Sequence, residues 1–468
     1  KDPTVCFASF LITTASIGPS RALVRSSMTE TMPLYLDRVA SEVLRRLTEF
    51  FDVYALLAIR PLSKPWLACV NEAATAWRAC YVMRFGPPSD HIAANGWLNA
   101  FRKALEKESK TLSLWCAGCG LQSEAPIIFS SFVRSWACDG DLLVAGLYDG
   151  TLQPYEWSTG QVGLQFQGRH LDEVVCIDLN EDFIISGSGD PGYYNRRPRD
   201  SSVKVWNRRD GTLLGSSNSH EETVRGVILF PRGSELGSYG LSASLNGDVL
   251  LWSLPSASSG SGTLTTVQGT SVGASCRSLL LVAPGGRQPS AASEARVLAS
   301  AGRDVVELSV SPDSPASVTQ LHRVCVSTSP ISGIDCYIPA WRWVNLLAGA
   351  AYPTSLLDAE GVVVAGGSVS GEVWHRRDGI LKQRAMAHAS ARETQEVVSV
   401  ELLDSQRLLA VSRRGHIFLT EWNAHAEHLE KLWSMDGLRM YVSTIRRREP
   451  RVLVSDGFDN AIRLLRVG

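Results

Sequence analysis

Two short motifs in this chain contain residue types that could do chemistry. Residues Gly187 to Gly192 fit the spacing G-x-G-x-x-G, and a separate pair, Cys116 and Cys119, fits C-x-x-C. The glycine motif cradles the phosphates of a dinucleotide only when it joins a strand to a helix. Here strand-forming residues flank it and no helical pattern follows. We therefore expect no dinucleotide site.

The cysteine pair is the one candidate for a metal site. A structural zinc ion needs four ligands, and only Cys138 or His91 lies within plausible reach in sequence. Two ordinary thiols are the favoured interpretation, with zinc as the alternative. Neither a nucleophile elbow nor a histidine-rich helix occurs, so the sequence predicts no catalytic residue, no metal and no cofactor.

Composition limits the classes of partner. The chain has 468 residues, of which 20% are charged, and a net charge of -1, which is enough material for two or three domains. It has no basic run suited to nucleic acid and no run of 18 apolar residues suited to a membrane. Its ten scattered cysteines fit reduced thiols, which predicts a cytoplasmic or nuclear protein.

The type of secondary structure that the sequence predicts changes along the chain. From about Ser123, short apolar runs alternate with turns rich in Gly, Asp, Asn and Ser. Residues 241–252 show the pattern most clearly, as a strand, a tight polar turn and a strand that ends in tryptophan. The same order recurs at 144–152, 184–206 and 362–374, with weaker copies at 297–310, 408–420 and 452–465. Such a repeat predicts an all-β domain over residues 123–468.

Residues after the third strand of each repeat are shared as well. Segments 206–211 and 374–379 fit W-D-x-x-T-G, and His170 and His220 each precede a first strand. These segments resemble WD repeats. The resemblance implies an all-β propeller of about seven blades, with six or eight as alternatives. The last repeat lacks an outer strand, and we expect residues 125–130 to supply it and close the ring.

The resemblance also implies a hydrogen-bonded chain inside a blade, made by a histidine, a serine of the second strand, a turn aspartate and the tryptophan. In this sequence the matching residues are His170, Ser186 or Ser188, Asp200 and Trp206. The set is incomplete in the other repeats. Most blades are therefore expected to hold by apolar packing.

The N-terminal part of the chain carries a helical pattern instead. Val39, Val43, Leu44, Leu47 and Phe51 recur at three- and four-residue steps, which predicts one helical stripe. The ungapped segment Val39 to Trp66 resembles an F-box, although Ala40 stands at a usual proline and Thr48 at a usual aliphatic residue. We predict a small all-α F-box at 34–85, a helical linker at 86–122 and a disordered segment at 1–33. For that first segment, an organelle-targeting sequence or a leader before Met28 or Met32 is the alternative.

Together the two resemblances imply a multidomain, non-catalytic substrate receptor of an SCF-type ubiquitin ligase, acting in ubiquitin-dependent protein degradation. The F-box would bind a Skp-family adaptor, and through it a cullin, while the propeller binds a target protein. The adaptor-binding residues implied are Leu44, Leu47, Phe51, Leu56, Leu57 and Leu62. Because propellers are general interaction platforms, a scaffold subunit of a large assembly is the alternative.

Arginines at the turns are the candidate target-binding residues. Arg303-Asp304 resembles a turn found in some phosphopeptide-binding WD propellers, and Arg225, Arg413 and Arg414 fall at first strands or second-to-third-strand turns. A propeller places those positions on one face, where guanidinium groups could hold a phosphorylated target. Solvated turn arginines are the alternative. Arg208, Arg209, Arg376 and Arg377 are expected on the opposite face.

Overall fold

The computed structural model describes a helix and 30 strands that divide between two compact units, one of residues 1–107 with 340–350 and one of 108–339 with 351–468. The described residues are 78, 81, 96–116, 121–189, 198–232, 234–255, 262–282, 294–313, 315–325, 330–337, 363–368, 372–377, 380–386, 397–403, 407–412, 415–423, 428–435, 442–448, 451–456 and 459–467. The predicted segment 1–33 lies outside these residues. So does the predicted F-box, apart from Arg78 and Tyr81.

The first unit contributes the start of the helix α7 (Trp97–Cys116). Leu98 and Phe101, which are spaced for one helical face, are both buried. The Trp97 and Tyr81 rings pack edge to face, with 5.7 Å between their centroids. The Arg78 guanidinium lies 5.8 Å from the centroid of the Trp97 ring. The helix predicted in the linker is thus observed. Among the described residues, no helix is long and apolar enough to cross a membrane.

The described strands of the second unit form seven antiparallel sheets, apart from one parallel addition at an edge. The first three sheets in chain order are β3 (Val133–Asp139), β4 (Leu142–Leu147), β5 (Leu152–Glu156) and β6 (Gln161–Val162); β7 (Val174–Leu179), β8 (Phe183–Ser188), β9 (Val203–Asn207) and β10 (Leu213–Ser217); and β11 (Val224–Leu229), β12 (Tyr239–Ser244), β13 (Asp248–Ser253) and β15 (Thr265–Ser271). The short strand β14 (Gly262–Thr263) adds in parallel to β10.

The remaining sheets follow the same plan. They are β16 (Leu279–Val282), β17 (Ala295–Ala301), β18 (Asp304–Ser311) and β19 (Ser317–Cys325); β20 (Ile331–Tyr337), β21 (Val363–Ser368), β22 (Glu372–Arg377) and β23 (Ile380–Met386); β24 (Val397–Leu402), β25 (Arg407–Ser412), β26 (Ile417–Asn423) and β27 (His428–Met435); and β28 (Val442–Arg448), β29 (Arg451–Asp456) and β30 (Ala461–Val467), with β1 (Leu121–Ser123) and β2 (Ile127–Ile128) on β30.

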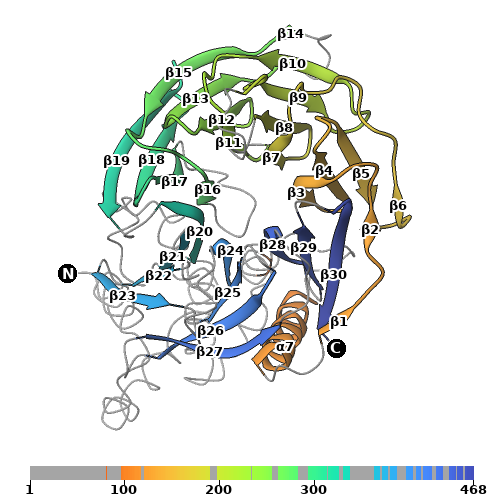
Figure 1. Ribbon diagram of the computed structural model, residues 1–468, viewed down its shortest axis with the longest axis vertical. Helices are drawn as coiled ribbons and strands as arrows, with labels where there is room; N and C mark the ends of the chain where they lie inside the picture. The colour runs from red at the N-terminus through yellow and green to blue at the C-terminus, as the bar shows by residue number, and fades with distance from the viewer. Residues whose placement is uncertain are drawn as a thin grey trace, which may run out of the picture. The chain divides into compact units, whose positions relative to one another are not determined.

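The first strands of these sheets form a closed ring. Each contacts the first strand of the next sheet, in the order β3, β7, β11, β16, β20, β24, β28 and back to β3. Figure 1 shows these strands on the inner side of the ring and the later strands of each sheet farther out. The second unit is a β-propeller, which confirms that part of the predicted fold.

The ring closes through strands from its two ends. β2 pairs with β30 through Ile127 opposite Ile462, and β1 pairs with the far end of the same strand through Leu121 opposite Val467. Asn460 donates its side-chain N–H to Phe129 O across 331 positions of sequence, and Trp136 Nε1 donates to Ser455 Oγ at 3.0 Å. The predicted outer strand from residues 125–130 is confirmed, and β1 extends it toward the N-terminus.

The hydrophobic core lies between neighbouring sheets. One layer joins Val144 and Leu152 to Val174, Ile184 and Trp206, and similar layers follow between the next pairs of sheets. Strand β8 is buried at all six of its residues because both of its faces are covered. This double burial explains the near-continuous apolar runs in the sequence, since a strand covered on both faces has no solvent side to mark with polar residues.

Candidate functional site

One face of the propeller is built from the second-to-third-strand turns and the segments that precede the first strands. In the sheet of β3, Tyr148 N–H donates to Phe132 O within the sheet, and Gly150 O accepts from His170 N–H of the next one. In the sheet of β16 to β19, Gly302 N–H donates to Ser275 O and Gly302 O accepts from Ile331 N–H. Each turn therefore joins its own sheet to the next.

Glycine permits this close approach. Gly150 has a φ of +83°, and a Cβ added there would lie 2.3 Å from His170 O. Gly247 has a φ of +91°, and its added Cβ would lie 2.4 Å from Ala274 O. Residues that carry a side chain rarely adopt this left-handed backbone region. Because the obstructing atoms are backbone, making room for a Cβ at either position would be costly. We call this surface the turn face.

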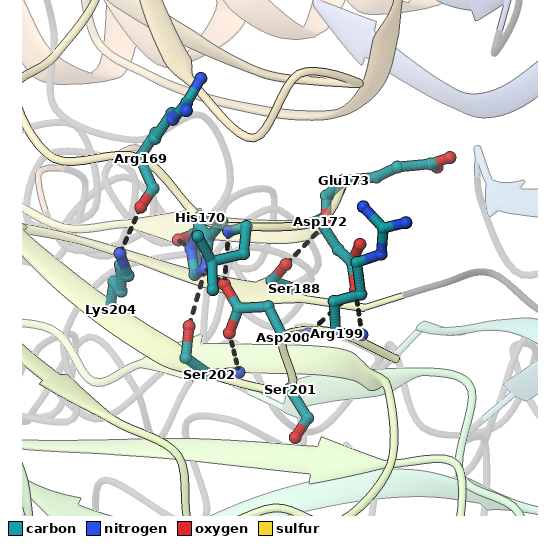
Figure 2. Close-up of polar contacts among 12 residues, drawn as sticks. Arg169, His170, Asp172, Glu173, Ser188, Arg199, Asp200, Ser201, Ser202 and Lys204 are labelled. Atoms are coloured by element: carbon teal, nitrogen blue, oxygen red, sulfur yellow. Dashed lines mark hydrogen bonds and ion pairs between the residues drawn. The ribbon is translucent and has the colours of Figure 1, made fainter. Parts of the chain in front are cut away.

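A buried polar network underlies the turn face in the sheet of β7 to β10 (Figure 2). His170 Nε2 lies 2.7 Å from Ser186 Oγ, while His170 Nδ1 lies 2.9 Å from Ser202 Oγ and 3.3 Å from Asp200 Oδ2. Asp200 also accepts the backbone N–H groups of Leu171 and Ser202, at 2.7 and 2.8 Å. The network holds the turn of one sheet against the segment before its first strand.

The electrostatics of this network fit a neutral histidine beside an ionised carboxylate. Burial lowers the pKa of His170, although the hydrogen bond and charge of Asp200 oppose that change. Burial alone would raise the pKa of Asp200, but hydrogen bonds from His170, Ser202 and the Leu171 N–H lower it below the usual value. His170 then carries its proton on Nδ1, toward Asp200, and its Nε2 accepts from the Ser186 hydroxyl.

Serine, histidine and aspartate in this contact order resemble a hydrolase triad, but their setting is structural. Ser186 and His170 are 0% and 1% exposed, and Asp200 is 7% exposed. A nucleophilic serine must reach a substrate carbonyl, whereas Ser186 lies within a strand covered on both faces. The set can stiffen the sheet, and no substrate can reach it.

The prediction for this network is correct in three residues and wrong in the fourth. Of the two serines considered, Ser186 contacts the histidine, while Ser188 Oγ donates to Glu173 O. Trp206 does not join the chain, because its Nε1 donates to Gln167 O at 3.1 Å. Its ring still packs edge-on against His170, at 5.6 Å between centroids.

The next sheet contains a second buried polar network, although the sequence predicts only an incomplete residue set in this repeat. His220 Nε2 lies 2.6 Å from Ser242 Oγ, and Trp252 Nε1 donates to the same oxygen at 2.7 Å. His220 Nδ1 is buried and has no hydrogen-bond partner in the described part of the chain. Burial lowers the pKa of His220 to about 4, against the opposing charge of Asp248.

The structure describes two of the four predicted target-binding arginines. Arg225 lies on β11 and is partly buried, and Arg303 is exposed in the turn between β17 and β18. Both positions belong to the turn face. Arg413 and Arg414 lie outside the described residues, as do the predicted adaptor-binding residues Leu44, Leu47, Phe51, Leu56, Leu57 and Leu62.

On the opposite face, Arg208 joins two sheets. It follows β9 and donates to Asp139 Oδ2 at 2.5 Å, to Asp139 O at 2.8 Å and to Asn180 O at 2.5 Å. Arg208 is therefore fixed in place between neighbouring sheets, whereas Arg209 is exposed. Arg376 and Arg377 end β22, also before a third-to-fourth-strand turn.

Two further arginines of the turn face were missed from sequence. Arg134 on β3 forms an ion pair with Glu173 at 2.5 Å, and its guanidinium lies 5.4 Å from the Tyr148 ring centroid. Arg277 precedes β16, and its Nε is buried without a partner among the described residues. For Arg134, the sequence did offer a signal. It directly follows the first residue of a first strand, which is the position that Arg225 holds in its own sheet.

Within the described residues, no group of three histidine, cysteine or acidic side chains could hold a metal ion. Cys119 and His91, two of the four residues of the alternative zinc site, lie outside those residues. Cys138 lies on β3 and is not in a disulfide.

Comparison with known proteins identifies no family. No family model matches the sequence, and no curated protein matches it. A crystal structure of the computationally designed Ika8 protein matches over 74% of this chain and 100% of that one, at 14% sequence identity and a TM-score of 0.46. At these values the likeness indicates neither a family nor a function.

Proposed function

We propose that this chain is a non-catalytic protein-binding receptor, and that it serves as the substrate-recognition subunit of an SCF-type ubiquitin ligase. The observation that carries the proposal is a closed β-propeller on the same chain as the F-box-like segment Val39 to Trp66. The segment would bind a Skp-family adaptor, and through it a cullin, in the cytoplasm or nucleus. The propeller would hold the target.

The described propeller suits a receptor because its turn face is rigid. Turn glycines and backbone hydrogen bonds join neighbouring sheets at this face, and the Arg134 to Glu173 ion pair adds a side-chain link between two of them. A preorganised surface loses little conformational entropy when it binds. In such a receptor, rate acceleration comes from holding an acceptor lysine of the target beside the conjugating enzyme.

Adaptor binding tests the proposal. Changing Leu56 and Leu57 together to Asp would place two charges in the proposed apolar interface, so adaptor capture by the full-length chain should fall by about 100-fold or more. The propeller gives an internal control, because its thermal unfolding should stay unchanged. Full capture by the double variant would contradict the F-box assignment.

The same pull-down separates the receptor from the alternative scaffold. A receptor should co-purify with a Skp-family adaptor and a cullin, and should promote ubiquitin transfer to whatever protein the propeller holds. A scaffold should instead co-purify with stoichiometric assembly partners and without the adaptor.

A further inference from the structure

The outermost strand of the first sheet is shorter than its counterparts. β6 has two residues, whereas β10, β15, β19, β23 and β27 have between five and nine. Beyond β6 the chain stays beside β5, because Gly163 N–H donates to Pro154 O at 2.8 Å. Farther on, Phe166 N–H donates to Leu152 O at 2.9 Å. The outer edge of this sheet is therefore formed by β6 and residues 163–166.

This edge presents backbone groups that no other strand takes up. The N–H and C=O groups of successive residues in a strand point to opposite sides. Gly163 donates toward β5, so the groups of its neighbours Val162 and Leu164 point outward. These outward groups have no hydrogen-bond partner in the part of the chain that the structure describes. An edge of this kind can accept a further strand.

Two exposed aliphatic side chains lie at this edge. Leu164 is 90% exposed, and Ile128 on β2 is 52% exposed. Their segments are joined, because Gln165 Nε2 donates to Ser130 Oγ at 2.7 Å. Figure 1 shows β2 and β6 on the outer side of the ring. We call Ile128, Val162 and Leu164 the rim edge.

The rim edge lies in an uncharged surface. Residues 125–133 and 157–168 contain no charged side chain, although 20% of the whole chain is charged. Natural sheets usually keep their edges apart with charges, and β19, β23 and β27 each contain lysine or arginine. β10 is covered by β14, and the uncharged β15 exposes no large apolar side chain. The rim edge thus lacks the protection that the other outer strands have.

We propose that the rim edge joins this chain to a second copy of itself, through an antiparallel pair of the two outer strands about a two-fold axis at Gly163. In this register, Val162 of each copy lies opposite Leu164 of the other. The outward N–H and C=O groups then form about four backbone hydrogen bonds between the copies. The Leu164 side chains of both copies leave water in the same step.

The absence of charge favours an identical partner over a different protein. Around a two-fold axis each surface meets itself, so a charged edge would bring like charges together. The rim edge avoids this repulsion. The amides of Gln161 and Gln165 both donate and accept, so they suit copies of themselves. A different protein is usually selected by complementary charge, which this edge does not offer.

The pairing should be weak and should add avidity. The contact is small, so the dissociation constant of the dimer is expected on the order of 10 µM. It uses the outer side of the ring and leaves the turn face of each copy uncovered. A target with two binding segments could then engage both copies at once. The inference goes beyond the proposed function and does not depend on it.

Sedimentation equilibrium of the full-length chain, from about 1 to 200 µM, tests the proposal. Wild type should dimerise over this range. Leu164→Lys brings like charges together and should raise the dissociation constant by about tenfold or more. Leu164→Pro removes the outward N–H and should do the same. Leu321→Lys, which changes an exposed leucine on β19, is the matched control and should dimerise as wild type does.

Thermal unfolding of the three variants shows whether the propeller is intact. It should stay unchanged in Leu164→Lys, because that side chain is 90% exposed. A wild-type chain that is monomeric throughout, or a dimer that either Leu164 variant leaves unchanged, would overturn the proposal. So would equal weakening by Leu321→Lys. A monomeric chain would instead leave the edge open to an extended segment of another protein.

Adaptor capture on the same preparations separates this inference from the ligase assignment. A dimer that depends on Leu164, without adaptor capture, would leave the rim edge standing and reject the ligase assignment. Adaptor capture by a chain that stays monomeric would reject the rim edge alone.

Discussion

Two neighbouring sheets of this propeller contain the same kind of buried polar network, whose links are histidine to serine, histidine to turn residue and tryptophan to serine. Each sheet forms two of these three links, and the missing link differs between them. In the sheet of β7 to β10, His170 contacts Ser186 and Asp200, and Trp206 bonds elsewhere. In the sheet of β11 to β15, His220 and Trp252 share Ser242, and the histidine Nδ1 has no partner in the part of the chain that the structure describes. The contact between histidine and serine is common to both.

The difference follows from one turn residue. Asp200 stands three residues before Val203 and six before Trp206, and Asn246 holds the same place before Val249 and Trp252. Asn246 Oδ1 accepts from Ser244 Oγ and from Asp248 N–H at 3.2 Å, and its Nδ2 donates to Asp248 Oδ2 at 2.6 Å. The Asn246 side chain is thus occupied within its own turn, and His220 Nδ1 has no acceptor among the described residues. In the other sheet, the Asp200 carboxylate accepts both from a backbone N–H of its turn and from the histidine.

Removing the carboxylate should give the largest effect. Asp200→Ala removes the acceptor for His170, the Leu171 N–H and the Ser202 N–H, and should lower the free energy of unfolding by about 3 kcal/mol. Asp248→Ala is the matched control in the next sheet. Its carboxylate accepts from Asn246, so it should cost less than about 1 kcal/mol. Urea titration of both variants measures the difference, and similar losses would contradict the comparison.

The two serines should differ in the same experiment. Ser242→Ala leaves both Trp252 Nε1 and His220 Nε2 unpaired, and should cost about 2 to 3 kcal/mol of unfolding free energy. Ser186→Ala leaves only His170 Nε2 unpaired and should cost about half as much. A greater loss from Ser186→Ala would mean that the tryptophan hydrogen bond contributes nothing.

Acid should destabilise the sheet of β11 to β15 through His220. The unfolded chain binds a proton on this histidine near pH 6.5, and the folded chain does so only near its lowered pKa of about 4. The unfolded state therefore binds more protons between these values, and stability falls as the pH falls. From neutral pH to pH 5 the loss from this group is about 2 kcal/mol. Unfolding of wild type and His220→Gln from pH 8 to 4.5 checks it, because the variant should show a shallower decline.

Completing the network should give the smallest effect. Asn246→Asp places a carboxylate beside His220 Nδ1, in the position that Asp200 holds in the preceding sheet, and should raise the unfolding free energy by about 1 kcal/mol at neutral pH. The pKa of His220 should rise with it, which NMR titration of the ring can follow. A destabilised variant with an unchanged pKa would show that the turn cannot bring the carboxylate to the ring.

The strand and turn pattern was readable because it depends on local chemistry. Short apolar runs between Gly, Asp, Asn and Ser turns predict strands. The resemblance to WD repeats, not spacing alone, implied that His170, Ser186 or Ser188 and Asp200 lie together. Trp206 was predicted wrongly because its acceptor, Gln167 O, lies in the segment between β6 and β7, outside the repeat pattern.

Side-chain partners explain the other misses. The opposite-face placement of Arg208 and Arg209 was expected, but nothing in the sequence indicated that Arg208 would be bound by Asp139 and Asn180 of two different sheets while Arg209 stays exposed. Arg277 precedes one of the weaker repeats, at 297–310, so no pattern drew attention to it. Its unpaired Nε is a three-dimensional property.

Ring closure sets a schedule for synthesis. β2 is synthesised before strands β3 to β29, and its partner β30 is the last described strand to be synthesised. Phe129 must therefore wait for 331 further residues before Asn460 can donate to it. At about 5 to 20 residues per second, the wait is roughly 15 to 65 seconds. Throughout that time the ring is open and β2 has no partner strand, and unpaired strand edges are templates for aggregation. The propeller should therefore depend on chaperones most during its own translation, and little once β30 has paired.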